Sequence, residues 1–234
     1  MMQKKSVTSL GNDMIQIAGV IDQKEADELI ACGATLLGFP LRLPVNSEDL
    51  SEAEAAAIIK GLADGIDAVL ITYQNEAQDI SNFCQEMGAK FIQLHGEVSK
   101  QELEKLRLIS PKLTIFKSLV TGKYSLDELL QSVKLLSPFV DAFITDSFDS
   151  KTGATGATGK LHDWSISRAL VIASPKPVIL AGGLTPENVY EAIMTVKPAG
   201  VDTHTKVEAP DGRKDLAKVK KFISESKRAF AALA

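Results

Sequence analysis

Short apolar runs rich in β-branched residues alternate with longer helical patterns along nearly the whole chain. Strands are expected near 14–19, 35–39, 67–72, 90–94, 113–118, 140–146, 177–181 and 199–203. Helices are expected near 23–32, 51–63, 75–87, 99–109, 124–136, 164–173, 186–195 and 214–232. Eight such units in 234 residues match a (β/α)₈ barrel. An open doubly wound sheet usually has fewer strands, and no Gly-x-Gly-x-x-Gly follows the first one. We therefore expect an α/β fold, a single (β/α)₈ barrel domain over residues 14–234, preceded by an N-terminal extension over residues 1–13.

The helix ends carry local signals that support this assignment. Asp22 with Glu25, and Ser51 with Glu54, have the spacing of a capping box, in which side chains satisfy the first free N–H groups of a helix. Gly88 follows a helical pattern and is typical of a left-handed helix stop.

Composition and charge exclude several classes of function. The net charge of −4 gives no footprint for nucleic acid, so no nucleic-acid partner is expected. No run approaches the ~18 apolar residues of a membrane span, and the first 12 residues lack the apolar stretch of a signal peptide, so a cytoplasmic location is expected by default. The two cysteines, Cys32 and Cys84, favour buried thiols over a disulfide. No Cys/His cluster has zinc-ligand spacing, and we expect neither a metal nor a cofactor.

The ends of the last two predicted strands favour a phosphate site. Gly182 and Gly183 end the seventh strand, ahead of a helix start, and Thr205 and Lys206 follow the eighth. Glycines let a backbone approach an anion, and N–H groups at a helix start donate to it. In barrels this pair of loops commonly binds phosphate. The alternative is a plain tight turn between strand and helix.

A second glycine-rich segment, "SKTGATGATGKLHDW", follows the sixth predicted strand. It is long for a connection between strand and helix, which favours a role in closing over a ligand. Lys151 or Lys160 would supply positive charge there, and Gly159 is a candidate phosphate contact. The alternative is a flexible connection.

Titratable side chains stand at four strand ends, where a barrel places its chemistry. Asp146 ends the sixth strand and is a natural general acid or base, or else a cap or loop-ordering group. His95 and His204 end the fourth and eighth strands, and either could move a proton or be structural. Lys117, at the end of the fifth, could form a Schiff base with a carbonyl substrate or simply attract an anion.

Several segments occur in the order seen in the phosphoribosylanthranilate isomerase family. They are "QIAGVIDQKEA", "LLGF", "FIQLHGE", "ITDS", "TGATGKLHDW", "LAGGLTPENV" and "GVDTHTKVEAPDGRKD". The resemblance covers residues 14 to about 232, and the combination of motifs is more specific than any one of them.

The resemblance implies an Amadori rearrangement, the conversion of an aminoaldose phosphate to an aminoketose phosphate. A general acid protonates the furanose ring oxygen, and a general base removes the proton from C2′. Asp146 matches the family's acid, and Asp202 matches an aspartate that faces the anthranilate end of the substrate. Gly182, Gly183 and the segment 203–206 match the family's phosphate loops.

Three positions depart from the family pattern. The family's first strand usually reads Lys-Ile-Cys-Gly with the cysteine as general base, whereas this chain has Ala18 at that position. The family's Ser-Pro-Arg, whose arginine holds the substrate carboxylate, is missing near residue 44, and Arg42 is the nearest candidate replacement. His204 and Lys206 stand where Ser-Ser-Gly or Asn-Ser-Ala is more usual.

The leading interpretation is an isomerase of this type acting on a small phosphorylated sugar. His204 is the candidate replacement base, because the eighth strand of a closed barrel lies beside the first. Alternatively, His204 holds Asp202 or a phosphate. Arg42, His95, Lys117 and Asp202 are the candidate substrate contacts. Two other functions stay open: another phosphosugar enzyme, for example a Schiff-base lyase that uses Lys117, and a non-catalytic barrel that binds a phosphometabolite. The oligomeric state is left open.

Overall fold

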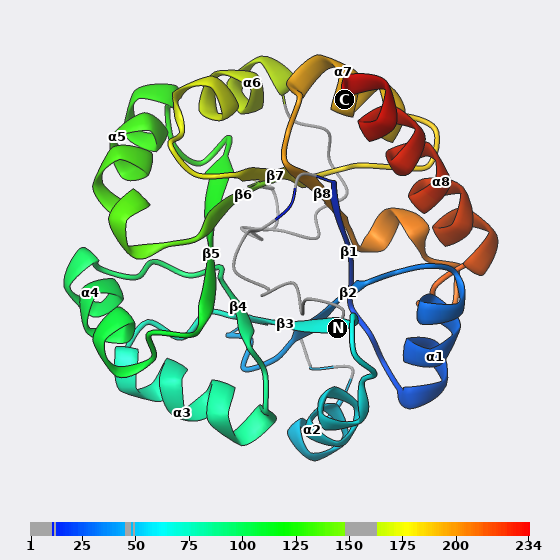
Figure 1. Ribbon diagram of the computed structural model, residues 1–234, viewed down its shortest axis with the longest axis horizontal. Coiled ribbons are helices and arrows are strands. Elements are labelled where there is room, and N and C mark those ends of the chain that lie inside the picture. Colours follow the sequence, from blue (N-terminus) through cyan, green and yellow to red (C-terminus); the bar gives the residue numbers. More distant parts are fainter. Residues whose placement is uncertain (1–10, 12, 45–47, 49, 148–162) are drawn as a thin grey trace, which may run out of the picture.

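A computed structural model describes residues 11, 13–44, 48, 50–147 and 163–234. Its strands form one closed parallel barrel in the order β1-β2-β3-β4-β5-β6-β7-β8, with β1 paired to both β2 and β8 (Figure 1). The strands are β1 (Met14–Ala18), β2 (Leu36–Pro40), β3 (Asp67–Thr72), β4 (Phe91–Leu94), β5 (Thr114–Thr121), β6 (Ala142–Ser147), β7 (Val178–Leu180) and β8 (Gly200–Thr203). The predicted fold class is thereby confirmed.

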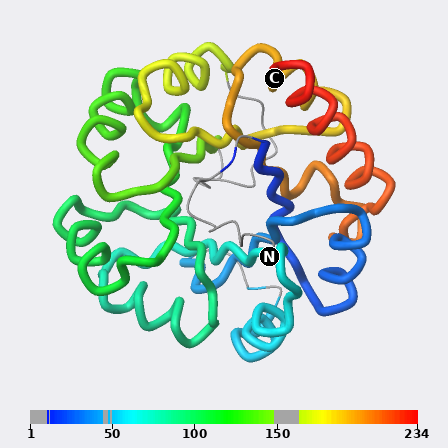
Figure 2. The backbone as a smooth tube through the Cα atoms, in the orientation of Figure 1, coloured from blue at the N-terminus to red at the C-terminus, as the bar shows by residue number. Residues whose placement is uncertain are grey.

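The helices form an outer ring around the barrel, as the backbone trace shows (Figure 2). They are α1 (Gln23–Ala31), α2 (Glu52–Gly61), α3 (Ala77–Met87), α4 (Lys100–Ile109), α5 (Leu126–Leu136), α6 (Trp164–Ala173), α7 (Val189–Val196) and α8 (Leu216–Leu233). Two short 3₁₀ helices, η1 (Ser137–Phe139) and η2 (Thr205–Val207), follow α5 and β8. None of the described helices is both long enough and apolar enough to cross a membrane.

The helix caps follow the sequence signals with one difference. Ser51 and Glu54 form the complete reciprocal box, and Gly88 ends α3 at a left-handed φ of 76°. Asp22 accepts the Glu25 N–H at 2.8 Å, but the Glu25 carboxylate bonds elsewhere. It accepts hydrogen bonds from the backbone N–H groups of Ile21 and of Lys214, and Lys214 is distant from it in the sequence. The second half of the Asp22 capping box was therefore predicted wrongly, because a tertiary contact claims the carboxylate.

Two element boundaries differ from the sequence prediction by three residues. β5 runs on to Thr121, three residues beyond the predicted strand end. α7 begins three residues later than expected, because Thr185 and Asn188 form a separate hydrogen-bonded turn before it. The predicted boundary at residue 14 coincides with the start of β1, and most of the proposed extension lies outside the described residues.

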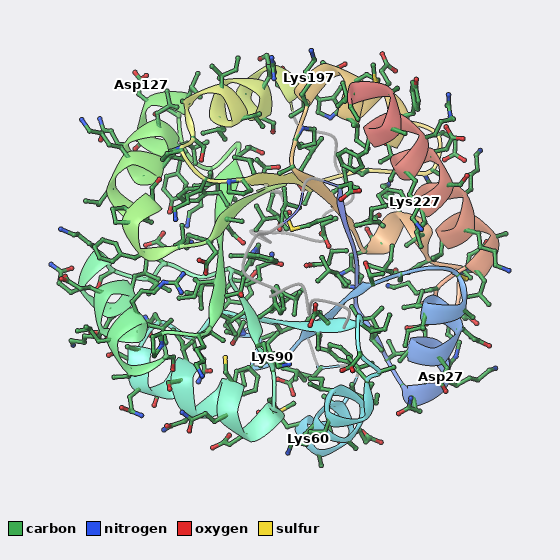
Figure 3. The ribbon with its side chains drawn as sticks, in the orientation of Figure 1. Asp27, Lys60, Lys90, Asp127, Lys197 and Lys227 are labelled. Carbon is green, nitrogen blue, oxygen red and sulfur yellow. The ribbon has the colours of Figure 1, made fainter. Side chains whose placement is uncertain are left out.

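The barrel interior is apolar at one end and polar nearer the other. Side chains from β2 to β7 and the residue after β7 form a compact apolar cluster in the interior: Leu36, Val69, Phe91, Phe116, Ala142, Ile144, Ile179 and Ala181. A larger cluster fills the space between the strands and the helix ring. Charged side chains such as Asp27, Lys60 and Asp127 are exposed on that ring (Figure 3). Since successive strand residues face opposite sides, parity along a strand decides which side chains reach the interior.

Candidate active site

Asp146 lies near the carboxyl end of β6, buried among groups from β4 and β5. Its Oδ2 is 3.6 Å from His95 Nδ1, and its Oδ1 accepts the Ser147 N–H at 2.7 Å. Burial raises the pKa of the Asp146 carboxyl, while His95 and the Ser147 N–H act in the opposite direction. A carboxyl whose neutral form is favoured by burial is suited to donate a proton.

His95 lies at the end of β4 and faces the same interior space. Its Nδ1 is 2.9 Å from Ser118 Oγ, and the Tyr73 ring meets the imidazole edge-on with centroids 4.7 Å apart. His95 is buried, so its ring is held by a hydroxyl, a carboxylate and an aromatic face. His95 and Asp146, each predicted to end a strand at the barrel mouth, lie beside each other in the structure.

A chain of buried amide side chains crosses the interior from β5 to β1. Gln93 Nε2 donates to Ser118 Oγ at 3.3 Å, and Gln16 Nε2 donates to Gln93 Oε1 at 3.2 Å. Sequence reasoning missed these three residues. The alternation of side chains along a strand could have identified two of them. Gln16 and Gln93 each stand two positions before a residue at the barrel mouth and therefore face the same interior side.

Asp202 continues this polar chain on β8. It is paired in register with Gln16, and hydrogen bonding from Gln16 lowers the pKa of its carboxyl. Burial and the neighbouring Asp146 outweigh that effect and raise the pKa of Asp202 to about 7. Among the described residues, Asp202 Oδ1 has no hydrogen-bond partner although it is buried. Such an orphaned acceptor inside a barrel is available to a ligand.

His204 follows β8 and packs on the end of β1, as expected from closure of the barrel. A Cβ placed on Gly19 would lie 2.1 Å from His204 Nε2, so only a glycine fits beneath the imidazole. Gly19 also has a φ of 81°, which glycine adopts without strain. The ring therefore lies next to Ala18, the position at which the family pattern has a cysteine.

A buried charged pair holds His204 from the other side. His204 Nε2 is 3.3 Å from Glu208 Oε1, which also accepts from Lys214 Nζ at 2.7 Å. The Lys214 side chain is fully buried. Burial, aided by the Lys214 charge, lowers the pKa of His204 to about 3. An imidazole with so low a pKa is neutral at pH 7 and a weak proton acceptor, which disfavours its predicted role as base.

Lys117 is on the opposite face of β5 from the interior groups. It has the parity of Ile115 and Leu119, which pack between strands and helices. Its Nζ donates to the backbone oxygens of Leu94 and Ser118 at 3.3 and 2.9 Å. Burial lowers the pKa of Lys117 to about 8. This placement separates the amine from Asp146 and Asp202, and it disfavours the Schiff-base role.

The structure contradicts the predicted role of Arg42. Its guanidinium donates to both carboxylate oxygens of Glu52, at 2.7 and 2.9 Å, and also pairs with Glu86 at 3.1 Å. It stacks over the Phe83 ring at 4.1 Å. These partners lie on α2 and α3, so the side chain faces the helix ring and is already bonded to carboxylates. Prolines flank the segment, but the local acidic residues, which sequence reasoning did not weigh, decide where the arginine points.

The predicted phosphate residues lie together at the ends of β7 and β8. Gly182 and Gly183 both have left-handed φ values, 97° and 69°, which turn the backbone sharply after β7. Thr203 Oγ1 donates to Leu184 O at 3.0 Å and ties the two loops together. Thr205 and Lys206 begin η2, and Lys206 is exposed. Gly159, Lys151 and Lys160 lie outside the described residues, so their predicted roles stay predictions.

Comparisons with known proteins agree on one family. The family model for N-(5'-phosphoribosyl)anthranilate (PRA) isomerase matches residues 15–225. N-(5'-phosphoribosyl)anthranilate isomerase 2 of Methanosarcina mazei is 36% identical over 218 residues, which cover 92% of this chain and 95% of that protein. The isomerase of Haloferax volcanii is 34% identical over 220 residues, covering 94% and 95%.

Solved structures give the same result for the fold. Phosphoribosyl anthranilate isomerase from Thermotoga maritima superposes with a TM-score of 0.77 at 25% identity, covering 92% of this chain and 99% of that one. Another solved isomerase, in complex with reduced 1-(o-carboxyphenylamino)-1-deoxyribulose 5-phosphate, superposes with a TM-score of 0.75 at 24% identity, with the same coverage. On sequence and fold together, the chain belongs to the phosphoribosylanthranilate isomerase family.

Proposed function

We propose that this chain catalyses the isomerisation of N-(5'-phosphoribosyl)anthranilate, the aminoaldose phosphate on which its relatives are named to act, and that it does so in tryptophan biosynthesis. The observation that carries the proposal is Asp146. It is a buried carboxyl with a raised pKa at the mouth of a closed barrel, at the position that the family resemblance assigns to the acid. A cytoplasmic location forms part of the proposal.

Asp146 would begin the reaction by giving its proton to the furanose ring oxygen. The C1′–O4′ bond then breaks, and the nitrogen lone pair forms the C1′=N bond of an open-chain iminium. Burial favours the protonated acid before the step. The His95 imidazole, 3.6 Å away, and the Ser147 N–H stabilise the carboxylate left after it.

A small phosphorylated sugar is the proposed partner. The isomerase structure with a reduced ribulose 5-phosphate derivative supports this, as does the glycine turn at the end of β7. We propose that Gly182 and Gly183, together with Thr205 and Lys206 of η2, bind its phosphate. Lys206 is exposed and carries a positive charge there.

Ala18 favours a second candidate, a barrel that binds the phosphosugar without turning it over. An alanine at the end of β1 cannot accept a proton, and loss of a general base typically costs ~10²–10⁴-fold in rate. The third interpretation, a Schiff-base lyase, receives little support, because Lys117 lies on the helix side of β5.

Two measurements separate these candidates. Loss of phosphoribosylanthranilate fluorescence reports turnover, and thermal stabilisation by reduced 1-(o-carboxyphenylamino)-1-deoxyribulose 5-phosphate reports binding. The isomerase predicts both signals. Stabilisation without turnover would support the binding barrel and contradict the proposed catalysis, while a borohydride-trapped adduct that vanishes in Lys117→Met would support a lyase. Complementation of a tryptophan auxotroph that lacks this isomerase gives the corresponding test in cells.

A further inference from the structure

Ala18 removes the family's base from β1, yet a second carboxylate faces the interior on the adjacent strand. We propose that Asp202 is the general base that removes the C2′ proton of the substrate, in place of the missing β1 thiol. This inference rests on the proposed function and assigns the step that Asp146 cannot perform.

The register of β1 and β8 places Asp202 below the vacant position. Asp202 pairs with Gln16, which has the same interior parity as Ala18 and precedes it by two residues. Nearer the mouth, β1 and β2 contribute Ala18 and its neighbour Gly38, with one methyl group and no side chain, while His204 lies two residues beyond Asp202 on β8. A Cβ on Gly38 would lie 2.9 Å from the Ala18 Cβ, so the two strands are close here. On the β1 and β2 side, only small side chains thus separate Asp202 from the mouth.

The two interior carboxylates differ in their free lone pairs. Asp146 Oδ1 accepts the Ser147 N–H, and its Oδ2 faces His95. Asp202 Oδ1 is buried and has no partner within the part of the chain that the structure describes. An orphaned buried acceptor costs free energy in the empty protein, and a ligand hydrogen at that atom would repay it.

Electrostatics couple Asp202 and Asp146. Burial and the negative charge of Asp146 raise the pKa of Asp202, so the pair holds one proton more readily than none. Gln16 and Lys214 both favour the ionised form of Asp202, whose pKa of about 7 suits a base at neutral pH. The proposed step starts from the form of the pair in which the one proton lies on Asp146 and Asp202 is ionised.

His204 is the competing base, and its contacts are less suited. Its Nε2 faces the Glu208 carboxylate, which pairs in turn with Lys214. Burial lowers the pKa of His204 to about 3, well below that of Asp202. We assign His204 a packing role, in which its ring covers Gly19 at the end of β1.

The proposed step balances as follows. Asp202 takes the proton from C2′, the C2′–H electron pair forms the C1′=C2′ bond, and the C1′=N electrons return to nitrogen, which gives the enolamine. Protonated Asp202 then returns its proton to C1′, and the enol O–H proton passes through solvent to the Asp146 carboxylate. The C2′ oxygen becomes the ketone, and both carboxyls regain their starting states. No oxidant or reductant takes part.

The test compares Asp202→Asn with the double variant Ala18→Cys/Asp202→Asn. We expect Asp202→Asn to lower kcat by at least ~10² while affinity for reduced 1-(o-carboxyphenylamino)-1-deoxyribulose 5-phosphate changes less than ~3-fold. Adding Ala18→Cys should recover at least ~10-fold of the loss, because the thiol then supplies the base. Asp67→Asn is the matched control, since burial also raises the pKa of Asp67, at the amino end of β3, and kcat should not change.

Each other outcome overturns the assignment. Asp202→Asn with kcat within ~10-fold of the unaltered chain, a double variant without recovery, or a loss of analogue binding that parallels the loss of kcat would each reject Asp202 as base. Turnover abolished by His204→Gln but kept by Asp202→Asn would transfer the role to His204. If the unaltered chain shows no turnover, the assignment of Asp202 as base is also rejected. If Ala18→Cys then creates turnover, the proposed substrate still stands. If Ala18→Cys creates none, the proposed function fails as well.

Discussion

The two sides of the barrel mouth both carry a buried carboxyl and a histidine, but they differ in whether the carboxyl oxygens have partners. On the β4–β6 side, Asp146 has partners for both oxygens and matches the family pattern. On the β8–β1 side, Asp202 keeps one orphaned oxygen, Ala18 supplies only a methyl group, and His204 is held by a buried ion pair. The first side, here called the retained side, matches the family pattern, and the second side, here called the rebuilt side, departs from it.

This difference indicates which catalytic group of such a site can be supplied by a different strand. A proton acceptor needs only to reach C2′, and the strand ends of a barrel converge on one mouth, so a neighbouring strand can supply it. The acid also needs surroundings that raise its pKa, and at Asp146 burial does so, while His95 acts in the opposite direction. The buried link through Gln16 and Gln93 connects the two sides physically.

The largest effect on stability is expected on the rebuilt side. Lys214→Met should leave the partly buried Glu208 carboxylate without its cation, at a cost of about 3 kcal/mol in the free energy of unfolding, the lower end of the range for a buried pair. Urea unfolding measures this cost, and Lys220→Met on the exposed face of α8 is the control, with a change below ~0.5 kcal/mol. Equal effects of the two variants would show that the ion pair is not what holds this side.

The retained side is tested by Asp146→Asn, which keeps the shape and removes the proton donor. We expect kcat to fall by at least ~10², about 2.7 kcal/mol, because the ring oxygen loses its acid. Circular dichroism should show an unchanged fold. Near-full activity of this variant would mean that the acid, too, lies elsewhere.

Asp202→Asn should raise the free energy of unfolding at pH 8 by about 2 kcal/mol. The pKa of the Asp202 carboxyl is raised from 3.8 to about 7, and the expected gain is set below the full free energy that this shift corresponds to. The native Asp202 holds its proton up to about pH 7, whereas the unfolded chain loses it near pH 4. Stability from this group is therefore complete at low pH and is lost as the pH rises through about 7. The gain from Asn should vanish at pH 4. A gain of equal size at both pH values would contradict the raised pKa.

The smallest effect is expected at Arg42, which lies outside both sides. Arg42→Ala removes a partly exposed pair with Glu52, so the free energy of unfolding should change by at most ~1 kcal/mol. KM for phosphoribosylanthranilate should stay unchanged, since the guanidinium is bonded to α2 and α3. A tenfold rise in KM would support the predicted contact between Arg42 and the substrate carboxylate.

The barrel could be predicted because its information is local. Apolar runs, caps such as Ser51 with Glu54, and a stop at Gly88 each act over a few residues, and together they specify eight units. The proximity of His204 to β1 followed from closure alone.

The chemistry at each strand end depended on contacts that sequence order hides. Arg42 is captured by Glu52 and Glu86, which no spacing rule pairs with it. The low pKa of His204 follows from burial next to Lys214, and the raised pKa of Asp202 from burial next to Asp146. Such effects need the three-dimensional arrangement, because desolvation and charge act across strands that are distant in the chain.

The most direct measurement compares phosphoribosylanthranilate turnover by the unaltered chain with that of Ala18→Cys, followed by loss of substrate fluorescence. If Asp146 and the rebuilt β8–β1 side form a complete site, the unaltered chain turns the substrate over, and Ala18→Cys changes kcat by less than ~10-fold. An unaltered chain that leaves the fluorescence constant, together with an Ala18→Cys variant that removes it, would show that the β8–β1 side lost its base without a replacement.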